Sequence, residues 1–126
     1  MTGEQILVVE DNEKNMKLFR DVLVATGYRT LEATTGSEAV DMASEHTPDL
    51  VLMDIQLPDL DGVQALHRLR ANARTAKIPV LALTAQAMQG DRERFLAAGF
   101  DGYLSKPVDV RELIGTVREH CDRLAG

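Results

Sequence analysis

The sequence is poor in cysteine and in aromatic residues. Among its 126 positions there is one cysteine, Cys121, no tryptophan, and an aromatic content of 4%. A single cysteine cannot form an internal disulfide, which fits a reducing compartment, and in its helical context Cys121 is predicted to be a small packing residue. A cytoplasmic location is therefore expected.

Long hydrophobic runs are also missing. No apolar stretch approaches the roughly 20 residues that a membrane-spanning helix needs. The first five residues lack the basic region and the long apolar segment of a secretory signal. We therefore expect no membrane partner.

Positive charge is scarce, and the histidines are scattered. The formal net charge of −6 disfavours direct binding to nucleic acid, because phosphate backbones attract surfaces rich in Lys and Arg. His46, His67 and His120 share no zinc-ligand spacing with one another or with the cysteine. All three histidines are predicted to be solvated positions on helices.

What the chain does contain is a short apolar run, Leu50–Met53, that ends on Asp54. Four apolar residues followed by turn residues are typical of a strand buried on both faces at the centre of a parallel sheet. In open parallel sheets, ligands bind just beyond the carboxyl ends of the strands. Asp54 is therefore either a functional carboxylate or an ordinary strand-ending residue that caps the next turn.

The rest of the chain alternates between strand-like and helix-like patterns. Strands are predicted at 6–9, 29–33, 50–54, 78–83 and 102–105, and helices at 13–26, 38–46, 63–70, 91–98 and 110–124. Strict alternation implies a parallel sheet with helices on both faces. The fold class is α/β, a flavodoxin-like doubly wound domain with strand order 2-1-3-4-5. These elements occupy the whole chain, so residues 1–126 are expected to form one domain without an output domain.

Polar residues follow four of the predicted strands. They are Glu10 and Asp11 after the first strand, Asp54 after the third, Thr84 after the fourth and Lys106 after the fifth. Because parallel strands end at the same edge of a sheet, we expect these side chains to gather there. Crowded carboxylates repel one another unless a cation lies among them, and oxygen ligands suit Mg²⁺. With a lysine and a hydroxyl nearby, the set is suited to phosphoryl transfer onto Asp54.

Each of these residues also fits a structural role when it is taken alone. Glu10 and Asp11 are acids in a favourable place at the start of a helix. Thr84 could cap a helix, and Lys106 could be a solvated surface lysine. The functional interpretation depends on their joint occurrence at successive strand ends.

These residues give the chain a resemblance to response-regulator receiver domains of two-component signalling over essentially its full length. The matching positions are Glu10, Asp11, Asp54, Pro58, Asp61, Gly62, Thr84, Lys106 and Pro107. The segment 9–19 is similar to that of stand-alone receivers and of receivers in hybrid histidine kinases. The resemblance implies phosphorylation of Asp54 and Mg²⁺ binding by Asp11, Asp54 and the carbonyl of Gln56, with Glu10 acting through water. It also implies a cis peptide bond between Lys106 and Pro107.

The resemblance further implies a switch and a set of partners. Thr84 would turn toward the phosphoryl group, and Tyr103 would move into the vacated space. The donor would be a sensor histidine kinase or a histidine phosphotransfer protein, and a downstream protein target would bind the surface of the fourth helix, fifth strand and fifth helix. Leu18, Met88 and Pro107 are the predicted partner-surface residues, although Met88 fits the core equally well.

Two glutamines flank the predicted phosphoryl site. Gln56 and Gln86 stand two residues beyond the phosphoacceptor and the switch hydroxyl, positions that vary in the family. An amide can orient a water molecule but cannot take its proton, which predicts self-dephosphorylation of intermediate rate.

Three other functions remain to be weighed. The chain could be a receiver segment of a hybrid histidine kinase. An aspartyl-phosphate phosphohydrolase would need a second acid where Gln56 stands, and a flavin carrier would need a phosphate cradle where Glu10 and Asp11 stand. We therefore expect a signalling protein that is not an enzyme, apart from accepting and losing its own phosphoryl group.

Overall fold

Five parallel strands form a sheet in the order β2-β1-β3-β4-β5 in the computed structural model, which describes residues 3–85 and 91–125. The elements are β1 (Gln5–Val9), α1 (Glu13–Ala25), β2 (Arg29–Ala33), α2 (Gly36–His46), β3 (Leu50–Asp54), α3 (Gly62–Ala71), β4 (Val80–Thr84), α4 (Asp91–Ala98), β5 (Gly102–Ser105) and α5 (Val110–Ala125). The predicted fold class and strand order are confirmed. Within residues 3–85 and 91–125, no helix has the length and apolar character that a membrane crossing requires.

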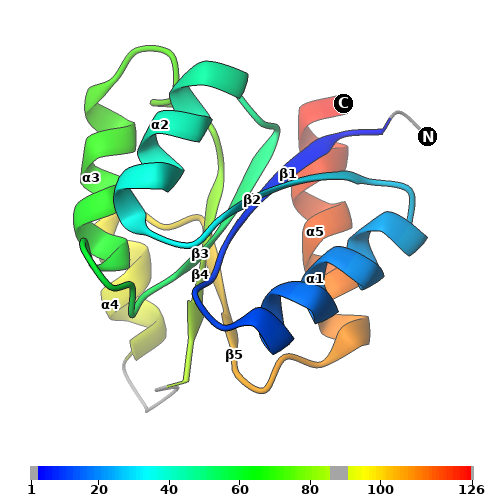
Figure 1. Cartoon of the computed structure of the whole chain (residues 1–126). Helices are drawn as coiled ribbons and strands as arrows, with labels where there is room; N and C mark the ends of the chain where they lie inside the picture. The colour runs from blue at the N-terminus through cyan, green and yellow to red at the C-terminus, as the bar shows by residue number, and fades with distance from the viewer. Residues whose placement is uncertain (1–2, 86–90, 126) are drawn as a thin grey trace.

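Helices cover both faces of the sheet (Figure 1). Helices α1 and α5 lie on one face, and α2, α3 and α4 lie on the other. Because successive strand residues point to opposite faces, Ile6 and Val8 pack with α1 and α5, whereas Leu7 and Val9 pack with α2 and α3. Strands β3 and β4 are buried along their whole length, as their apolar runs predicted.

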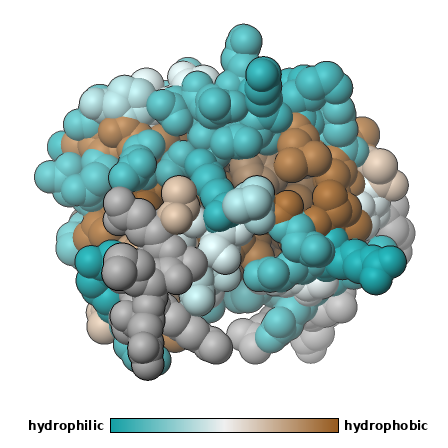
Figure 2. Space-filling model, turned by 90° about the horizontal axis from the view of Figure 1, so that it is seen from below, coloured by the Kyte–Doolittle hydropathy of each residue, from teal (hydrophilic) through white to brown (hydrophobic). Residues whose placement is uncertain are grey.

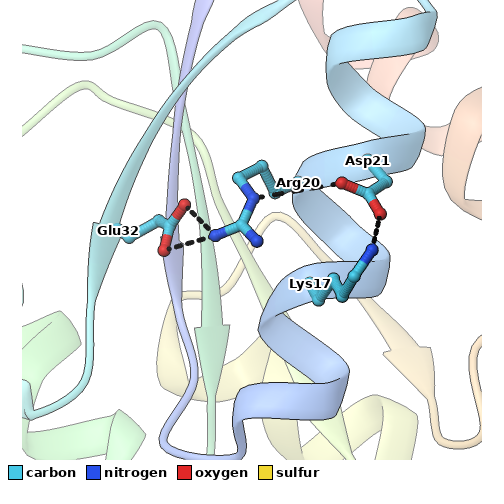
Figure 3. Close-up of polar contacts among 4 residues, drawn as sticks. All are labelled: Lys17, Arg20, Asp21 and Glu32. Atoms are coloured by element: carbon cyan, nitrogen blue, oxygen red, sulfur yellow. Dashed lines mark hydrogen bonds and ion pairs between the residues drawn. The ribbon is translucent and has the colours of Figure 1, made fainter.

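Strand β2 lies at one edge of the sheet and is joined to α1 by an ion pair. The Nη1 atom of Arg20 donates to both carboxylate oxygens of Glu32, at 2.9 and 3.2 Å (Figure 3). One turn away, Lys17 and Asp21 form an i,i+4 pair on the exposed surface of α1. The mixed burial of β2 fits its place at the edge of the sheet.

Helix α2 begins two residues earlier than the sequence pattern indicated. The predicted helix begins at residue 38, whereas Gly36 and Ser37 already belong to α2. Their backbone N–H groups donate to the carboxylate of Asp59, which lies 23 and 22 residues further along the chain. A cap supplied from so far away leaves no signal in the local sequence.

Arg70, near the end of α3, makes contacts far beyond its own helix. Its guanidinium donates to the carbonyl oxygens of Ala76 and Ile78, at 3.2 and 2.7 Å. It also pairs with Asp101 Oδ2 at 3.0 Å, and the same oxygen accepts the N–H of Val80 at 2.8 Å. Arg70 therefore links the end of α3 to the starts of β4 and β5.

The prediction of a solvated position is also wrong for His120, which is 8% exposed. Its Nδ1 atom lies 2.9 Å from the carbonyl oxygen of Thr116 one turn earlier. The ring packs beside Gly102, where a Cβ atom would lie 3.7 Å from the imidazole Cε1. His46 and His67 are exposed as predicted, and Cys121 is buried in the core next to α1.

Candidate functional site

The carboxyl ends of β1, β3 and β5 bring three charged side chains together. Alternate side chains of these strands point toward α1 and α5. The same alternation places Glu10, Asp54 and Lys106 on that face of the sheet. The Nζ atom of Lys106 lies 2.7 Å from Glu10 Oε1 and 2.8 Å from Asp54 Oδ2. Glu10 and Asp54 are 1% and 5% exposed, so this is a nearly buried pair of carboxylates bridged by one ammonium group.

Asp11 completes an acidic cluster that could hold a cation. Ligand oxygens of Glu10, Asp11 and Asp54 all lie within 4.8 Å of one another, and Asp11 is exposed at the mouth of the site. The contact between Glu10 Oε1 and Lys106 is an ion pair without hydrogen-bond alignment, which leaves this buried oxygen open to a further ligand. Hard oxygen donors at this spacing fit Mg²⁺, which retains several of its water molecules in protein sites. The cluster therefore fits the predicted metal.

The charges in this cluster shift one another's ionisation. Burial raises the pKa of Glu10 above its usual value, and the charge of Asp54 adds to the rise, although contact with the Lys106 ammonium opposes it. Burial alone would lower the pKa of Lys106, but its contacts with the carboxylates of Asp54 and Glu10 outweigh burial and raise the pKa. The lysine stays charged, and it offsets much of the repulsion between the acids.

The cluster opens into a cavity of about 470 Å³ at the edge where the strands end. Its lining residues are Glu10, Asp11, Asn12, Asn15, Asp54, Gln56, Leu57, Pro58, Ala85 and Lys106. Figure 2 looks onto this side of the molecule and shows hydrophobic areas beside hydrophilic side chains. Gln56 and the small Ala85 are exposed at the rim, so the cavity is accessible to a phosphodonor or to water.

Two asparagines in this lining were missed by the sequence analysis. The N–H of Asn12 donates to Glu10 Oε2 at 3.2 Å, and the side chain of Asn12 caps α1 by accepting the N–H of Asn15. The position of Asn12 just before the helix pattern is a known capping signal. That signal predicts the cap, but it does not predict the second contact with Glu10.

Thr84 and Tyr103 lie on the opposite side of the sheet from Asp54 and Lys106. Thr84, at the end of β4, is 4% exposed. Tyr103 is half-buried on the neighbouring strand β5, opposite Ala82, and it packs against the α2–α4 core and Phe95. The two residues share one face, and their positions on paired strands are offset by two residues.

The loop after β3 is tied directly to the phosphoacceptor candidate. The N–H of Gln56 donates to Asp54 Oδ1 at 2.9 Å, and the N–H of Gly62 donates to the carbonyl of Ile55 at 2.9 Å. On the other side of the site, the N–H of Lys106 donates to the carbonyl of Thr84 at 2.7 Å. The peptide bond between Lys106 and Pro107 is cis, as the resemblance implied.

The predicted partner-surface residues fall into two groups. Leu18 is 39% exposed on α1, and Pro107 is exposed in the loop between β5 and α5. Met88 and the second flanking glutamine, Gln86, lie outside the described residues.

Comparison with known families gives one match that covers most of the chain. Residues 6–118 match the model of the response regulator receiver domain. The polar-differentiation response regulators DivK of Brucella ovis and Brucella anthropi are each 47% identical over 117 residues. Each alignment covers 93% of this chain and 95% of the relative.

Solved structures agree with this match. The receiver domain of a sensor histidine kinase from Pseudomonas aeruginosa PAO1, with a magnesium ion coordinated in its active site cleft, is 40% identical with a TM-score of 0.88. The receiver domain of a Francisella response regulator is 29% identical with a TM-score of 0.89. The alignments cover 96% of this chain in both cases, and 99% and 98% of the two structures.

Proposed function

The chain belongs to the response regulator receiver domain family, and we propose that Asp54 accepts a phosphoryl group from the phosphohistidine of a sensor histidine kinase or a histidine phosphotransfer protein. The observation that carries the proposal is the Lys106 ammonium, which lies 2.8 Å from Asp54 Oδ2 beside two further carboxylates. The phosphoryl transfer would take place in the cytoplasm, on one receiver domain formed by residues 1–126.

In the proposed transfer, a carboxylate oxygen of Asp54 attacks phosphorus. A P–O bond forms, the P–N bond to the donor imidazole breaks, and its electron pair leaves with the imidazole. Lys106 already lies beside the attacking carboxylate, so its ammonium can pair with the phosphoryl oxygens without a large movement. Glu10, Asp11, Asp54 and the Gln56 carbonyl would hold Mg²⁺, directly or through water, and the bound ion would neutralise charge on the phosphoryl oxygens.

The proposed response is a shift between two packings of the side chains on the far face of the sheet. Thr84 is at the strand end next to Asp54, where its hydroxyl could rotate to donate to a phosphoryl oxygen. Tyr103 on the adjacent strand has an apolar ring and one polar end, which allows it to occupy inner and outer positions. Such a switch would change the surface formed by α4, β5 and α5, to which a downstream protein would bind.

Signalling rather than turnover is the proposed output. The protein would catalyse only the gain and loss of its own phosphoryl group. Gln56 lies exposed at the rim of the cavity, where its amide can orient a water molecule without acting as a base.

We predict that Gln56→Ala changes the phosphoryl lifetime of the protein, and Gln86→Ala is tested in the same way. Loss of an orienting amide should slow hydrolysis by about tenfold, which is less than the roughly 10²–10⁴-fold that a positioned general acid or base contributes. The measurement is the decay of phosphorylated protein after the donor is removed. If both variants decay like the wild type, the glutamines have no role in hydrolysis.

A relay role is the second candidate, and the likeness to the receiver of a sensor histidine kinase favours it. Such a receiver would return its phosphoryl group to a histidine phosphotransfer protein. Donor docking is proposed around the start of α1 and Pro107, with Leu18 as an exposed contact. Leu18→Ala should lose phosphoryl transfer from the partner protein but should still be phosphorylated by a small-molecule donor. That result would support docking of the partner on this surface.

The test of the proposed function is intact mass after incubation with acetyl phosphate and Mg²⁺. The wild type should gain one phosphoryl group, and the gain should disappear in EDTA. Asp54→Asn should gain none, whereas Asp41→Asn, which changes an exposed acid on α2, should behave like the wild type. A Mg²⁺-dependent adduct on Asp54→Asn would show that another residue is the phosphoacceptor.

A further inference from the structure

The carboxylate of Asp59 ties the loop after β3 to the start of α2. Asp59 Oδ1 accepts the N–H of Gly36 at 2.7 Å and that of Leu60 at 2.8 Å, and Oδ2 accepts the N–H of Ser37 at 3.0 Å. Among the described bonds, the side chain of Thr35, the helix's own N-cap, accepts only the N–H of Glu38. Asp59 therefore satisfies the first two N–H groups of α2 from outside that helix.

The backbone of α2 also lies directly against this loop. A Cβ atom on Gly36 would lie 2.7 Å from Leu60 Cβ and 3.0 Å from the Leu60 carbonyl oxygen. Side chains do not approach this closely, so glycine is required for the contact. The hydrogen bonds of Asp59 and the contact between Gly36 and Leu60 form one joint, which we call the Asp59 joint.

The same loop forms one wall of the phosphoryl site. Gln56, Leu57 and Pro58 line the cavity next to Asp54. The loop is held at its start by the bond from the Gln56 N–H to Asp54, and at its end by the bond from the Gly62 N–H to Ile55. Between these two points, the Asp59 joint fixes the loop against α2.

We propose that Asp59 is a positioning residue for the cation site, because its contacts with α2 hold the loop that carries Gln56 into the cavity lining beside Asp11 and Asp54. This inference rests on the proposed function, in which that carbonyl is a Mg²⁺ ligand. Asp59 touches neither the ion nor the phosphoryl group, and it acts only through the loop. Mutation of a residue that orients a metal ligand typically lowers metal affinity or activity by about 10–100-fold.

The ionisation of Asp59 is consistent with this role. Hydrogen bonds from Ser37, together with those from the Leu60 and Gly36 N–H groups, hold the pKa of the Asp59 carboxyl far below its usual range. The carboxylate is therefore ionised at all pH values at which the protein would work, and the joint is permanent rather than switched by protons.

The test is the Mg²⁺ dissociation constant, measured by isothermal titration calorimetry on the whole protein. Asp59→Ala should bind Mg²⁺ about tenfold more weakly than the wild type. Asp59→Asn loses the same charge but keeps one carbonyl oxygen as an acceptor, so it should recover most of the affinity. If Asp59→Asn binds Mg²⁺ as weakly as Asp59→Ala, the effect comes from the lost charge alone, and the inference is overturned.

Glu38→Ala is the matched control. Glu38 is an exposed acid in the first turn of α2, and it accepts the N–H of Thr34 at 2.7 Å. The hydrogen bonds described for Glu38 join it to Thr34 and Thr35 and not to the β3–α3 loop. Its removal should leave Mg²⁺ affinity within about twofold of the wild type. An equal loss in Glu38→Ala and Asp59→Ala would mean that a weakened α2, and not the joint, is responsible.

The outcomes separate this inference from the proposed function. A wild-type protein that binds no Mg²⁺ would defeat both. If the wild type and Asp59→Ala bind Mg²⁺ equally well, the receiver chemistry stands and only the positioning role of Asp59 is lost.

Discussion

At the scale of single residues, the site is a compromise between burial and charge. Glu10 and Asp54 are nearly inaccessible, yet both are acids, and one lysine lies between them. Burying a charge is unfavourable unless it is paired, and one ammonium cannot neutralise three carboxylates. The residual repulsion is what makes this edge of the sheet attractive to a divalent cation.

Glu10→Gln should therefore stabilise the metal-free protein at neutral pH. Burial raises the pKa of Glu10 above its ordinary value of 4.5, so folding disfavours the ionised form. As the pH falls through the raised pKa toward 4.5, Glu10 takes up a proton more readily in the folded chain than in the unfolded chain. This proton uptake removes the unfavourable buried charge and stabilises the folded wild type. The advantage of the glutamine variant should be largest at neutral pH and should shrink as the pH falls.

Urea unfolding in EDTA, repeated from about pH 7.5 down to about pH 4.5, measures this difference in the free energy of unfolding. Glu45→Gln, which changes an exposed acid on α2, is the control and should track the wild type. Parallel curves for Glu10→Gln and the wild type would contradict the prediction.

At the scale of elements, two glycines in helices have opposite requirements. Gly62 is the first residue of α3, and a Cβ atom there would lie 2.8 Å from the Asp54 carbonyl oxygen and 2.9 Å from Ile55 Cα. Gly115 lies on the exposed side of α5, with nothing within 4 Å of its Cβ position. One glycine allows close backbone packing, whereas the other only weakens its helix.

Gly62→Ala should destabilise the fold by about 2 kcal/mol, because backbone atoms at the end of β3 would have to move. Gly115→Ala should stabilise the fold by about 0.5–1 kcal/mol through helix propensity alone. Urea unfolding of both variants gives the comparison. A stabilised Gly62→Ala would mean that the close contact with β3 is easily relieved.

The elements also show where sequence patterns were sufficient and where they were not. Strands and helices with clear periodicity were predicted within a few residues, because burial on one or both faces determines their composition. The start of α2 was mistaken and the contacts of Arg70 were not predicted, because Asp59 and Asp101 act on them across 23 and 31 residues. Contacts of that range leave no periodic signal in the chain.

At the scale of the whole molecule, topology placed the site. Parallel strands required Glu10, Asp54 and Lys106 to meet at one edge, and strand alternation gave them one face. Strand alternation could also have predicted the face on which Thr84 lies. Leu83 points toward α1 and α5, so Thr84, the next residue, points to the other face. The burial of His120 and the Asp59 joint depend on packing that only the folded chain specifies.

The single sheet also predicts that Mg²⁺ stabilises the entire fold, and not only the loops around the site. Both core clusters pack on the same sheet, so unfolding of one face removes support from the other. A ligand that binds only the folded chain should add about 2.7 kcal/mol to the free energy of unfolding when its concentration is a hundred times the dissociation constant.

Hydrogen exchange should slow by the corresponding factor of about 100 in the central strands β3 and β4, where exchange requires global unfolding. Asp11→Asn, which changes an exposed acid of the proposed Mg²⁺ site at little expected cost to packing, should lose most of this protection. Protection confined to the loops around Asp54 would mean instead that the edge of the sheet opens independently of its centre.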